Sequence, residues 1–218
     1  MPDLHSLRWR VVDSPDSIAA RYRRRRWDAM YAQFPDLGQL SVIDLGGRIG
    51  TWVGAPVRPA HVHIVNLEPP DTDAPDWIEV DHADACELPK EIASRQYDLV
   101  FSNSVMEHLG GHARRVAFAD AVHALSERHW IQTPYRYFPI EPHWLFPWFQ
   151  HLPVAARAAI TRRWPLTYSG AAETTASAVE GVMSVELLSR TELRHYFPDS
   201  RIVAERIGPL VKSITAMR

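Results

Sequence analysis

Short apolar runs alternate with helical patterns along most of the chain. Five runs are rich in β-branched or aromatic residues, which is typical of strands. They cover 40–45, 61–67, 77–80, 97–102 and 128–133. Helical patterns occupy 16–31, before the first run, and 112–126, between the last two. Strands that alternate with helices predict right-handed crossovers and a mostly parallel sheet, so the chain is expected to have an α/β fold.

The two helical patterns carry further expectations. Asp13 or Ser14 could cap the helix 16–31, and Pro15 suits its first turn. In 112–126 one apolar face is expected to pack on the sheet. Its members are Val116, Ala119, Val122 and Ala124.

The end of the chain adds one helix and two strands to this pattern. The run "VELLSRTELRHYF" predicts a helix capped by Ser189 or Thr191. The runs "RIVAERIG" and "SITAMR" then predict two closing strands. A hairpin at the edge of the sheet would make the last strand antiparallel.

The charge balance excludes one class of function. Lys and Arg number 24 against 26 Asp and Glu, for a formal net charge of -2. A binder of nucleic acid that ignores sequence needs an excess of positive charge, which this chain lacks. The local exception is "RYRRRRW" at 21–27, which we interpret as a solvated helix face, with a phosphate or nucleic-acid patch as the alternative.

Cysteine content and hydropathy indicate the compartment. The single cysteine, Cys86, cannot form an intrachain disulfide, and no CxxC zinc motif is present. Nowhere do about 18 apolar residues follow one another without a charge, so no membrane span is expected. These features predict a cytoplasmic protein.

A glycine-rich loop follows the first predicted strand in "VIDLGGRIGTW". In open α/β sheets, ligands bind at the carboxyl ends of the strands. Gly46, Gly47 and Gly50 would let the backbone approach a ligand closely, and Asp44 could hold a cation or an amide donor. An ordinary turn between strand and helix is the alternative interpretation.

Acids at the next strand ends point to a nucleoside. Glu68 closes the second strand, where a carboxylate can accept both ribose hydroxyls. Asp81 and Asp84 follow the third strand, near the expected adenine. An NAD-binding loop would also seat a pyrophosphate, usually through G-x-G-x-x-G, and the glycine spacing here differs.

The loop "DLGGRIG" resembles the motif D-x-G-x-G-x-G of class I S-adenosylmethionine-dependent methyltransferases. It matches at Asp44, Gly46 and Gly50 and departs at Arg48, where that family often has glycine. The resemblance covers about 40–133, and the closing segment is similar to that of small-molecule members. It implies a Rossmann-like fold with a seven-stranded, mostly parallel sheet, an antiparallel last strand and helices on both faces.

The resemblance also implies a cofactor and a set of site residues. The cofactor is S-adenosylmethionine, with Glu68 at the ribose and Asp84 and Ala85 at the adenine. The loop residues expected at the cofactor are Asp44, Gly46, Gly47 and Gly50. The segment after the fourth strand corresponds to Ser102, Asn103, Ser104, Glu107 and His108, beside the methyl donor.

The methyl acceptor is expected at an aromatic segment that follows the fifth strand. We predict a single domain in which 134–180 is an acceptor-binding insertion or lid. Transfer to a hydroxyl requires alignment and removal of a proton. His143, oriented by Glu141, is the expected base, His108 is the competing base, and a histidine packed in the core is the alternative interpretation of His143. Residues expected to bind the acceptor are Glu107, Tyr135, Tyr137 and Trp144.

The run "TPYRYFPIEPHW" is similar to that of bacterial sugar methyltransferases, including those of mycobacterial methylmannose polysaccharides. This similarity implies O-methylation of a small carbohydrate-like or oligosaccharide acceptor. Some sugar methyltransferases use a divalent cation such as Mg²⁺. The chain offers suitable ligand types at Glu107, His108, His112, Glu141 and His143. Their spacing fits no diagnostic metal pattern, so a hydrogen-bonding pocket is the favoured interpretation.

Other functions stay open at this point. One is methylation of a lipid, a quinone or a nitrogen atom, although the N/D-P-P-Y/F motif typical of DNA amino methylation is absent from "SNSVMEHL". Another is an inactive nucleotide-binding regulatory protein, for which Arg48 is the only indication. A homodimer is compatible with all of these.

Overall fold

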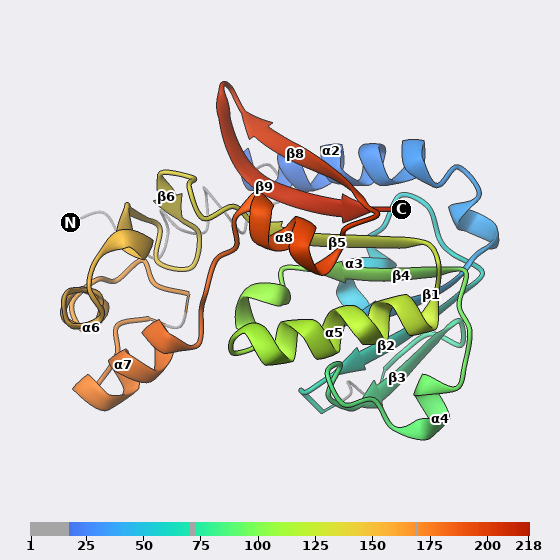
Figure 1. Cartoon of the computed structure of the whole chain (residues 1–218), viewed down its shortest axis with the longest axis horizontal. Helices are drawn as coiled ribbons and strands as arrows, with labels where there is room; N and C mark the ends of the chain where they lie inside the picture. The colour runs from blue at the N-terminus through green and yellow to red at the C-terminus, as the bar shows by residue number, and fades with distance from the viewer. Residues whose placement is uncertain (1–17, 70–72, 169) are drawn as a thin grey trace.

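A single seven-stranded sheet lies at the centre of the computed structural model, which describes residues 18–69, 73–168 and 170–218 (Figure 1). The strand order is β3-β2-β1-β4-β5-β9-β8. Strands β1 to β5 are parallel, and β9 is antiparallel to both of its neighbours. The strands are β1 Ser41–Leu45, β2 His61–Asn66, β3 Ile78–His82, β4 Leu99–Asn103, β5 His129–Pro134, β8 Arg201–Ile207 and β9 Leu210–Met217. This topology confirms the predicted sheet.

The described residues contain seven α-helices. They are α2 Ile18–Gln33, α3 Ile49–Val53, α4 Lys90–Ala93, α5 His112–Leu125, α6 Val154–Thr161, α7 Thr175–Met183 and α8 Arg190–Tyr196. Short 3₁₀ helices are η2 Leu37–Gln39, η3 Met106–His108 and η4 Phe149–His151. The predicted helices 16–31 and 112–126 correspond to α2 and α5, whereas Asp13, Ser14 and Pro15 lie outside the described residues.

Side-chain alternation in the strands builds one core on each face of the sheet. In β1, Val42 packs with Met30 of α2 and Trp52 of α3. The next residue, Ile43, packs with Phe118 of α5 on the opposite face. Successive side chains of a strand point to opposite faces, so both faces of this apolar strand are covered. The predicted helices on both faces are confirmed.

The inward face of α5 differs in part from the prediction. Ala119 and Val122 are buried as expected, but Val116 and Ala124 are exposed. The fully buried Phe118 sets the rotation of the helix, because this large ring removes more apolar surface from water than a valine or an alanine would. The face is therefore turned away from Val116.

The arginine run on α2 is not a uniform solvated face. Arg24 and Arg25 are exposed, as expected. Arg26 is largely covered, forms an ion pair with Glu205 of β8 at 2.8 Å, and donates to Asn103 of β4 at 2.5 Å. One of the four arginines therefore ties α2 to the sheet.

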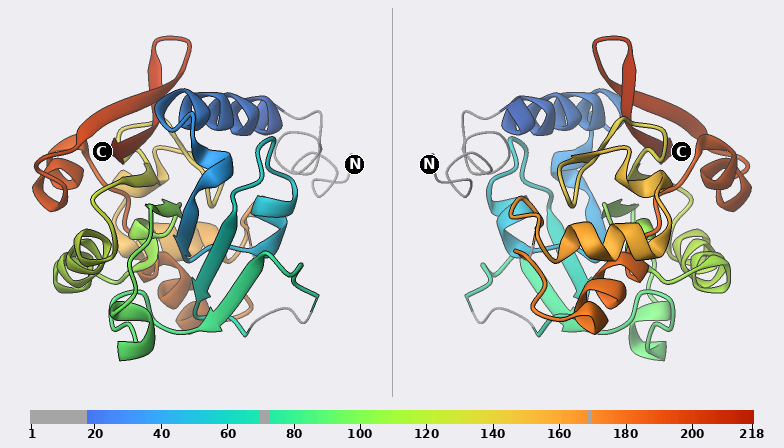
Figure 2. Two further views of the ribbon diagram at one scale, coloured as in Figure 1. Left: turned by 90° about the vertical axis from the view of Figure 1, so that its right-hand side faces the viewer. Right: turned by 90° about the vertical axis from the view of Figure 1, so that its left-hand side faces the viewer.

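The segment after β5 (135–189, the post-β5 segment) has a core of its own. It contains the hairpin of β6 Ile140–Glu141 and β7 Phe146–Pro147, followed by α6 and α7. Trp144, Phe149 and Val182 form its buried centre. It lies beyond the carboxyl ends of β4 and β5, and α6 and α7 stand in front of that edge in the right-hand view of Figure 2.

Across the described ranges, no helix has the length and apolar character needed to cross a membrane.

The start of α8 carries a capping box, which resolves the choice between two candidate caps. The Ser189 hydroxyl accepts from the Glu192 amide, and the Glu192 carboxylate accepts from the Ser189 amide. Thr191 lies inside the helix and is exposed. Ser189 is therefore the N-cap.

We expect Ser189→Ala to lower the free energy of unfolding by about 0.5 to 2 kcal/mol, because the amide of Glu192 loses its acceptor. Chemical denaturation of both proteins measures this. Thr191→Ala is the matched control and should change stability by less than about 0.5 kcal/mol. Equal losses in the two variants would contradict the assignment of the cap.

Candidate functional site

A first cavity of about 800 Å³ opens at the carboxyl ends of β1 to β4. This is where the order of the sheet reverses between β1 and β4, the usual ligand position in open α/β sheets. The predicted residues that line it are Asp44, Gly46, Gly47, Glu68, Asp84, Ala85, Asn103, Ser104, His108 and His143. Strand ends far apart in the sequence therefore meet as expected.

Two glycines of the loop after β1 are required by close contacts. Gly46 has φ +83°, and a Cβ there would lie 2.5 Å from a methyl of Val105. A Cβ on Gly47 would lie 1.8 Å from the carboxylate of Asp44. The loop can therefore follow this path only with glycine at both positions.

Two residues predicted at the cofactor do not line this cavity. Gly50 lies in α3, where a Cβ would meet no atom within 4 Å. Ser102 is fully buried, and its hydroxyl donates to the Leu45 carbonyl at 2.8 Å, which ties β4 to β1. Alternation along β4 points Ser102 to the face of the sheet that α5 covers, as it does Val100. Its neighbours Phe101 and Asn103 reach the cavity instead.

Asp44 places a buried carboxyl group at the floor of this cavity. One oxygen accepts from the Trp52 indole at 2.7 Å, and the other, Oδ1, has no hydrogen-bond partner in the protein. Burial raises the pKa of Asp44 to about 7, although the Trp52 hydrogen bond opposes the shift. The unpartnered oxygen can accept a donor group of a ligand.

Asn66, which the sequence reasoning missed, links the loop after β1 to the loop that bears Glu68. Its amide donates to the Gly47 carbonyl at 2.7 Å and accepts from the Glu68 backbone at 3.0 Å. The Glu68 side chain is exposed and pairs with Arg48 at 2.8 Å. The only available signal was the position of Asn66 at the end of a strand, two residues before the acid.

Asp84 is anchored while it lines the cavity. Arg114 donates to both of its oxygens, at 2.9 and 2.7 Å, and the Cys86 amide donates at 2.8 Å. Burial alone would raise the pKa of Asp84, but these hydrogen bonds outweigh it and lower the pKa. Asp81, the other acid after β3, pairs with His63 and does not line the cavity.

A chain of hydrogen bonds joins two histidines at the rim of this cavity. The Glu141 carboxylate accepts from His143 Nδ1 and the His143 amide, both at 2.7 Å, and from the Trp144 amide at 2.8 Å. His143 Nε2 lies 3.2 Å from His108 Nε2. The carboxylate thus fixes the His143 ring with Nε2 toward His108 and the cavity.

Glu107 precedes His108 and is completely buried on η3. One oxygen accepts from Thr133 at 3.0 Å, and Oε1 has no hydrogen-bond partner in the protein. Burial raises the pKa of Glu107 to about 7. Removal of the ring from water also lowers the pKa of His108, and the charge of His143 lowers it further by a smaller amount.

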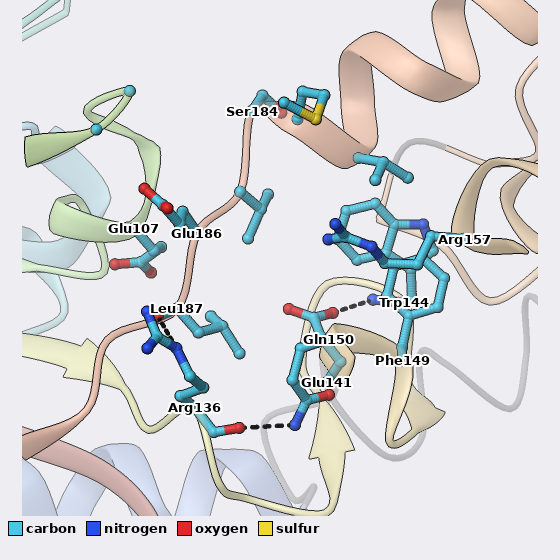
Figure 3. A pocket seen from close by; sticks show the side chains of 15 residues that line it. Glu107, Arg136, Glu141, Trp144, Phe149, Gln150, Arg157, Ser184, Glu186 and Leu187 are labelled. Carbon is cyan, nitrogen blue, oxygen red and sulfur yellow. Dashed lines mark hydrogen bonds between the residues drawn. The ribbon is translucent and has the colours of Figure 1, made fainter. Parts of the chain in front are cut away.

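A second cavity of about 500 Å³ lies on the other side of this group (Figure 3). Glu107 and Glu141 line it, whereas His108 and His143 line the first cavity. In Figure 3, Trp144 and Arg157 lie across the opening from Glu107 and Glu186. The two cavities therefore share a wall of two glutamates and two histidines.

Two of the four predicted acceptor residues do not line the second cavity. Glu107 and Trp144 do. Tyr135 and Tyr137 do not, and the exposed Tyr137 stacks on His151 instead. Arg136, which lies between the two tyrosines, is the residue of this stretch that lines the cavity.

Three buried polar atoms without a protein partner belong to residues that line the second cavity. They are Glu107 Oε1, Gln150 Oε1 and Arg157 Nε. The Gln150 amide nitrogen donates to two carbonyls, of Arg136 and Phe138, which assigns the opposite atom as the oxygen. Buried atoms of this kind are rarely left unpaired, so a polar ligand is expected here. Gln150 and Arg157 carried no signal in the sequence.

Comparison with known proteins gives structural neighbours only. No protein-family model and no curated protein matches the sequence. A methyltransferase structure from Mesorhizobium loti is 16% identical with a TM-score of 0.54, over 88% of this chain and 97% of that one. Magnesium protoporphyrin IX methyltransferase (ChlM) from Synechocystis, with bound SAH, is 12% identical with a TM-score of 0.53, over 99% and 94%.

A third neighbour is the N-methyltransferase NodS from Bradyrhizobium japonicum, 13% identical with a TM-score of 0.50, over 94% of this chain and 97% of that one. At these identities the likeness concerns the fold. The Rossmann-like methyltransferase fold predicted from the sequence is confirmed.

The buried Asp44 leads to a prediction on stability. A carboxyl group whose pKa is raised by folding holds its proton more tightly in the folded chain. The free energy of unfolding should therefore fall as the pH rises from the ordinary value of 3.8 to about 7, and this contribution should stay level above that.

Asp44→Asn removes this titration, so the stability of the parent relative to the variant should decline across the same range. Urea denaturation of both proteins at several pH values measures the difference. Identical pH dependence in the two proteins would show that Asp44 ionises normally.

Proposed function

We propose that the protein is an S-adenosylmethionine-dependent O-methyltransferase that acts on a hydroxyl of a small carbohydrate-like acceptor. The shared wall between the two cavities carries this proposal. The first cavity lies where this fold places a nucleotide, and the second contains unpaired polar atoms. The wall between them holds groups that can accept a proton.

The donor would occupy the first cavity. Gly46 and Gly47 allow the close approach of its amino-acid part, and Asp44 Oδ1 would accept from one of its donors. Glu68 would bind the ribose hydroxyls, which requires it to exchange Arg48 for the ligand. Asp84 and Ala85 would lie at the adenine. That ChlM holds SAH and SAM on the same fold supports this assignment.

The reaction would be an in-line displacement at the methyl carbon. The carbon–sulfur bond breaks as the carbon–oxygen bond forms, and the hydroxyl proton passes to His143 Nε2. Glu141 would stabilise the resulting imidazolium through its 2.7 Å contact with Nδ1. His108, 3.2 Å away, is the competing proton acceptor.

The acceptor class follows from the unpaired atoms of the second cavity. Two of them, on Glu107 and Gln150, need a donor, and Arg157 Nε needs an acceptor. A hydroxyl is both, so a ring with several hydroxyls can satisfy all three. Trp144, stacked on Phe149 at 4.4 Å, adds an aromatic surface for such a ring. We propose a mannoside of a methylated polysaccharide or a related sugar as the acceptor.

Three other predictions from the sequence are carried forward with this proposal. They are the role of 134–180 as an acceptor-binding lid, a homodimer and a cytoplasmic location. The separate core of the post-β5 segment supports the first. The other two stay predictions.

Titration calorimetry with S-adenosylmethionine tests the donor site. Glu68→Ala should weaken binding by about 1 to 3 kcal/mol, the cost of leaving a polar ribose edge unpaired. Glu87→Ala, an exposed acid outside the cavity, is the control and should bind like the parent. Unchanged affinity in the Glu68 variant would exclude this residue from the ribose site, and tighter binding of NAD would reject the donor.

Transfer of a labelled methyl group to a panel of mannosides and other polyols tests the reaction. His143→Ala should lower turnover at least about 100-fold, because positioned base catalysis contributes that much or more. Its affinity for the donor should change little. His151→Ala, an exposed histidine of the same segment that lines neither cavity, is the control. Full turnover in the His143 variant would remove His143 from the reaction, and an inactive parent across the panel would reject the sugar acceptor.

A further inference from the structure

We infer that Glu107, His108 and His143 form a binding site for one divalent transition-metal ion, with Glu141 as the positioning residue behind His143. The three side chains come from two parts of the chain that the fold brings together. One ligand atom from each lies within 4.8 Å of the others. The distances, the burial and the ligand chemistry of the group support the inference separately.

The two imidazoles have the separation of ligands to one ion. Their Nε2 atoms lie 3.2 Å apart. Nitrogen ligands about 2.0 to 2.1 Å from a tetrahedral Zn²⁺ are about 3.4 Å from each other. An ion can therefore join this pair with a shift of a few tenths of an ångström.

The Glu141 carboxylate prepares His143 for such a role. It accepts from Nδ1 at 2.7 Å, so a neutral ring carries its lone pair on Nε2, the atom that faces His108. Two backbone amides, of His143 and Trp144, hold the same carboxylate in place. A carboxylate behind a histidine ligand is the usual second partner in protein metal sites.

Glu107 is an independent observation that points to a ligand. Its side chain is completely buried, and Oε1 has no hydrogen-bond partner in the protein. A buried carboxylate without a full set of partners is costly unless a cation compensates it. An ion held by the neighbouring His108 would provide that compensation in place of the acceptor hydroxyl proposed above.

The ligand set selects the kind of ion. Two imidazoles and one carboxylate suit Zn²⁺, Mn²⁺, Fe²⁺ or Co²⁺ and leave coordination positions open. Mg²⁺ prefers oxygen ligands and is less well matched to this set. His112, another candidate ligand in the sequence, lies outside the group and hydrogen-bonds to Tyr196 at 3.0 Å.

The other group of this kind among the described residues lacks these features. In His63, Glu79 and Asp81, both ring nitrogens of the buried histidine are already paired. Nδ1 lies 2.6 Å from the Tyr97 hydroxyl, and Nε2 lies 2.9 Å from Asp81. This group is complete without an ion.

The role of the ion rests on the proposed function. Its open positions would lie at the wall between the two cavities, where an acceptor hydroxyl meets the donor. A bound ion would lower the pKa of that hydroxyl directly, and the released proton would pass to solvent water, because the His143 lone pair would then bind the ion instead of a proton. Binding of the ion itself does not depend on methyl transfer.

Titration calorimetry with Zn²⁺, and visible absorption after addition of Co²⁺, test the site in the metal-stripped full chain without any cofactor. We expect one ion per chain in the parent. His108→Ala and His143→Ala should each weaken binding at least about 100-fold, and Glu141→Gln about 10- to 100-fold. His112→Ala should bind like the parent. Circular dichroism identifies any variant that fails to fold. Glu107→Gln keeps the shape of the side chain but removes its charge, so its affinity for the ion should also fall.

Absence of stoichiometric binding in the folded parent, or equal losses in the His108 and His112 variants, would overturn the inference. The proposed function has a separate readout. Stoichiometric binding without methyl transfer to any acceptor would reject the function and keep the site. Methyl transfer that is unchanged in the metal-stripped protein, together with no binding, would reject the site and keep the function.

Discussion

The arrangement of the site depends on one buried carboxylate, that of Glu141. Only 1% of this residue is exposed, yet its oxygens accept three hydrogen bonds from its own hairpin. A buried charge persists only with such a set of partners. Because Glu141 accepts a hydrogen bond from His143 Nδ1, the His143 ring is oriented toward His108. This contact joins the post-β5 segment to η3, which follows β4. The shared wall of the two cavities is a consequence of this contact.

A comparable constraint shapes the other side of the first cavity. The Asp44 carboxylate occupies the space that a side chain at position 47 would need, and Val105 occupies the space beside position 46. The loop after β1 therefore packs closely against the ends of the strands. Asn66 then ties it to the loop that bears Glu68. Close packing within the protein therefore accounts for glycine at positions 46 and 47 without any ligand. The absence of side chains there also leaves space in the first cavity for a ligand.

The residues of the first cavity could be predicted from the local sequence pattern more completely than those of the second cavity. Asp44 lies near the end of β1, and Gly46, Glu68 and Asp84 follow parallel strands. Parallel strands end at one edge of the sheet, so the meeting of these residues could be predicted. Tyr135 and Tyr137 were reasonable candidates by composition, but the cavity lies beside the residue between them. Gln150 and Arg157 belong to short helices whose orientation no local pattern specifies. They were found only because their buried atoms lack partners in the folded chain.

The sequence by itself determined the class of the sheet, its five parallel strands, the closing hairpin and the loops that would bear the donor site. Each of these depends on hydrophobic periodicity and turn chemistry, which are local. Only the tertiary structure decided the rotation of α5, the inward position of Ser102 and the pairing of His108 with His143. Those outcomes depend on which side chains compete for the same space, and on how residues more than thirty positions apart satisfy one another's polar groups once water is excluded.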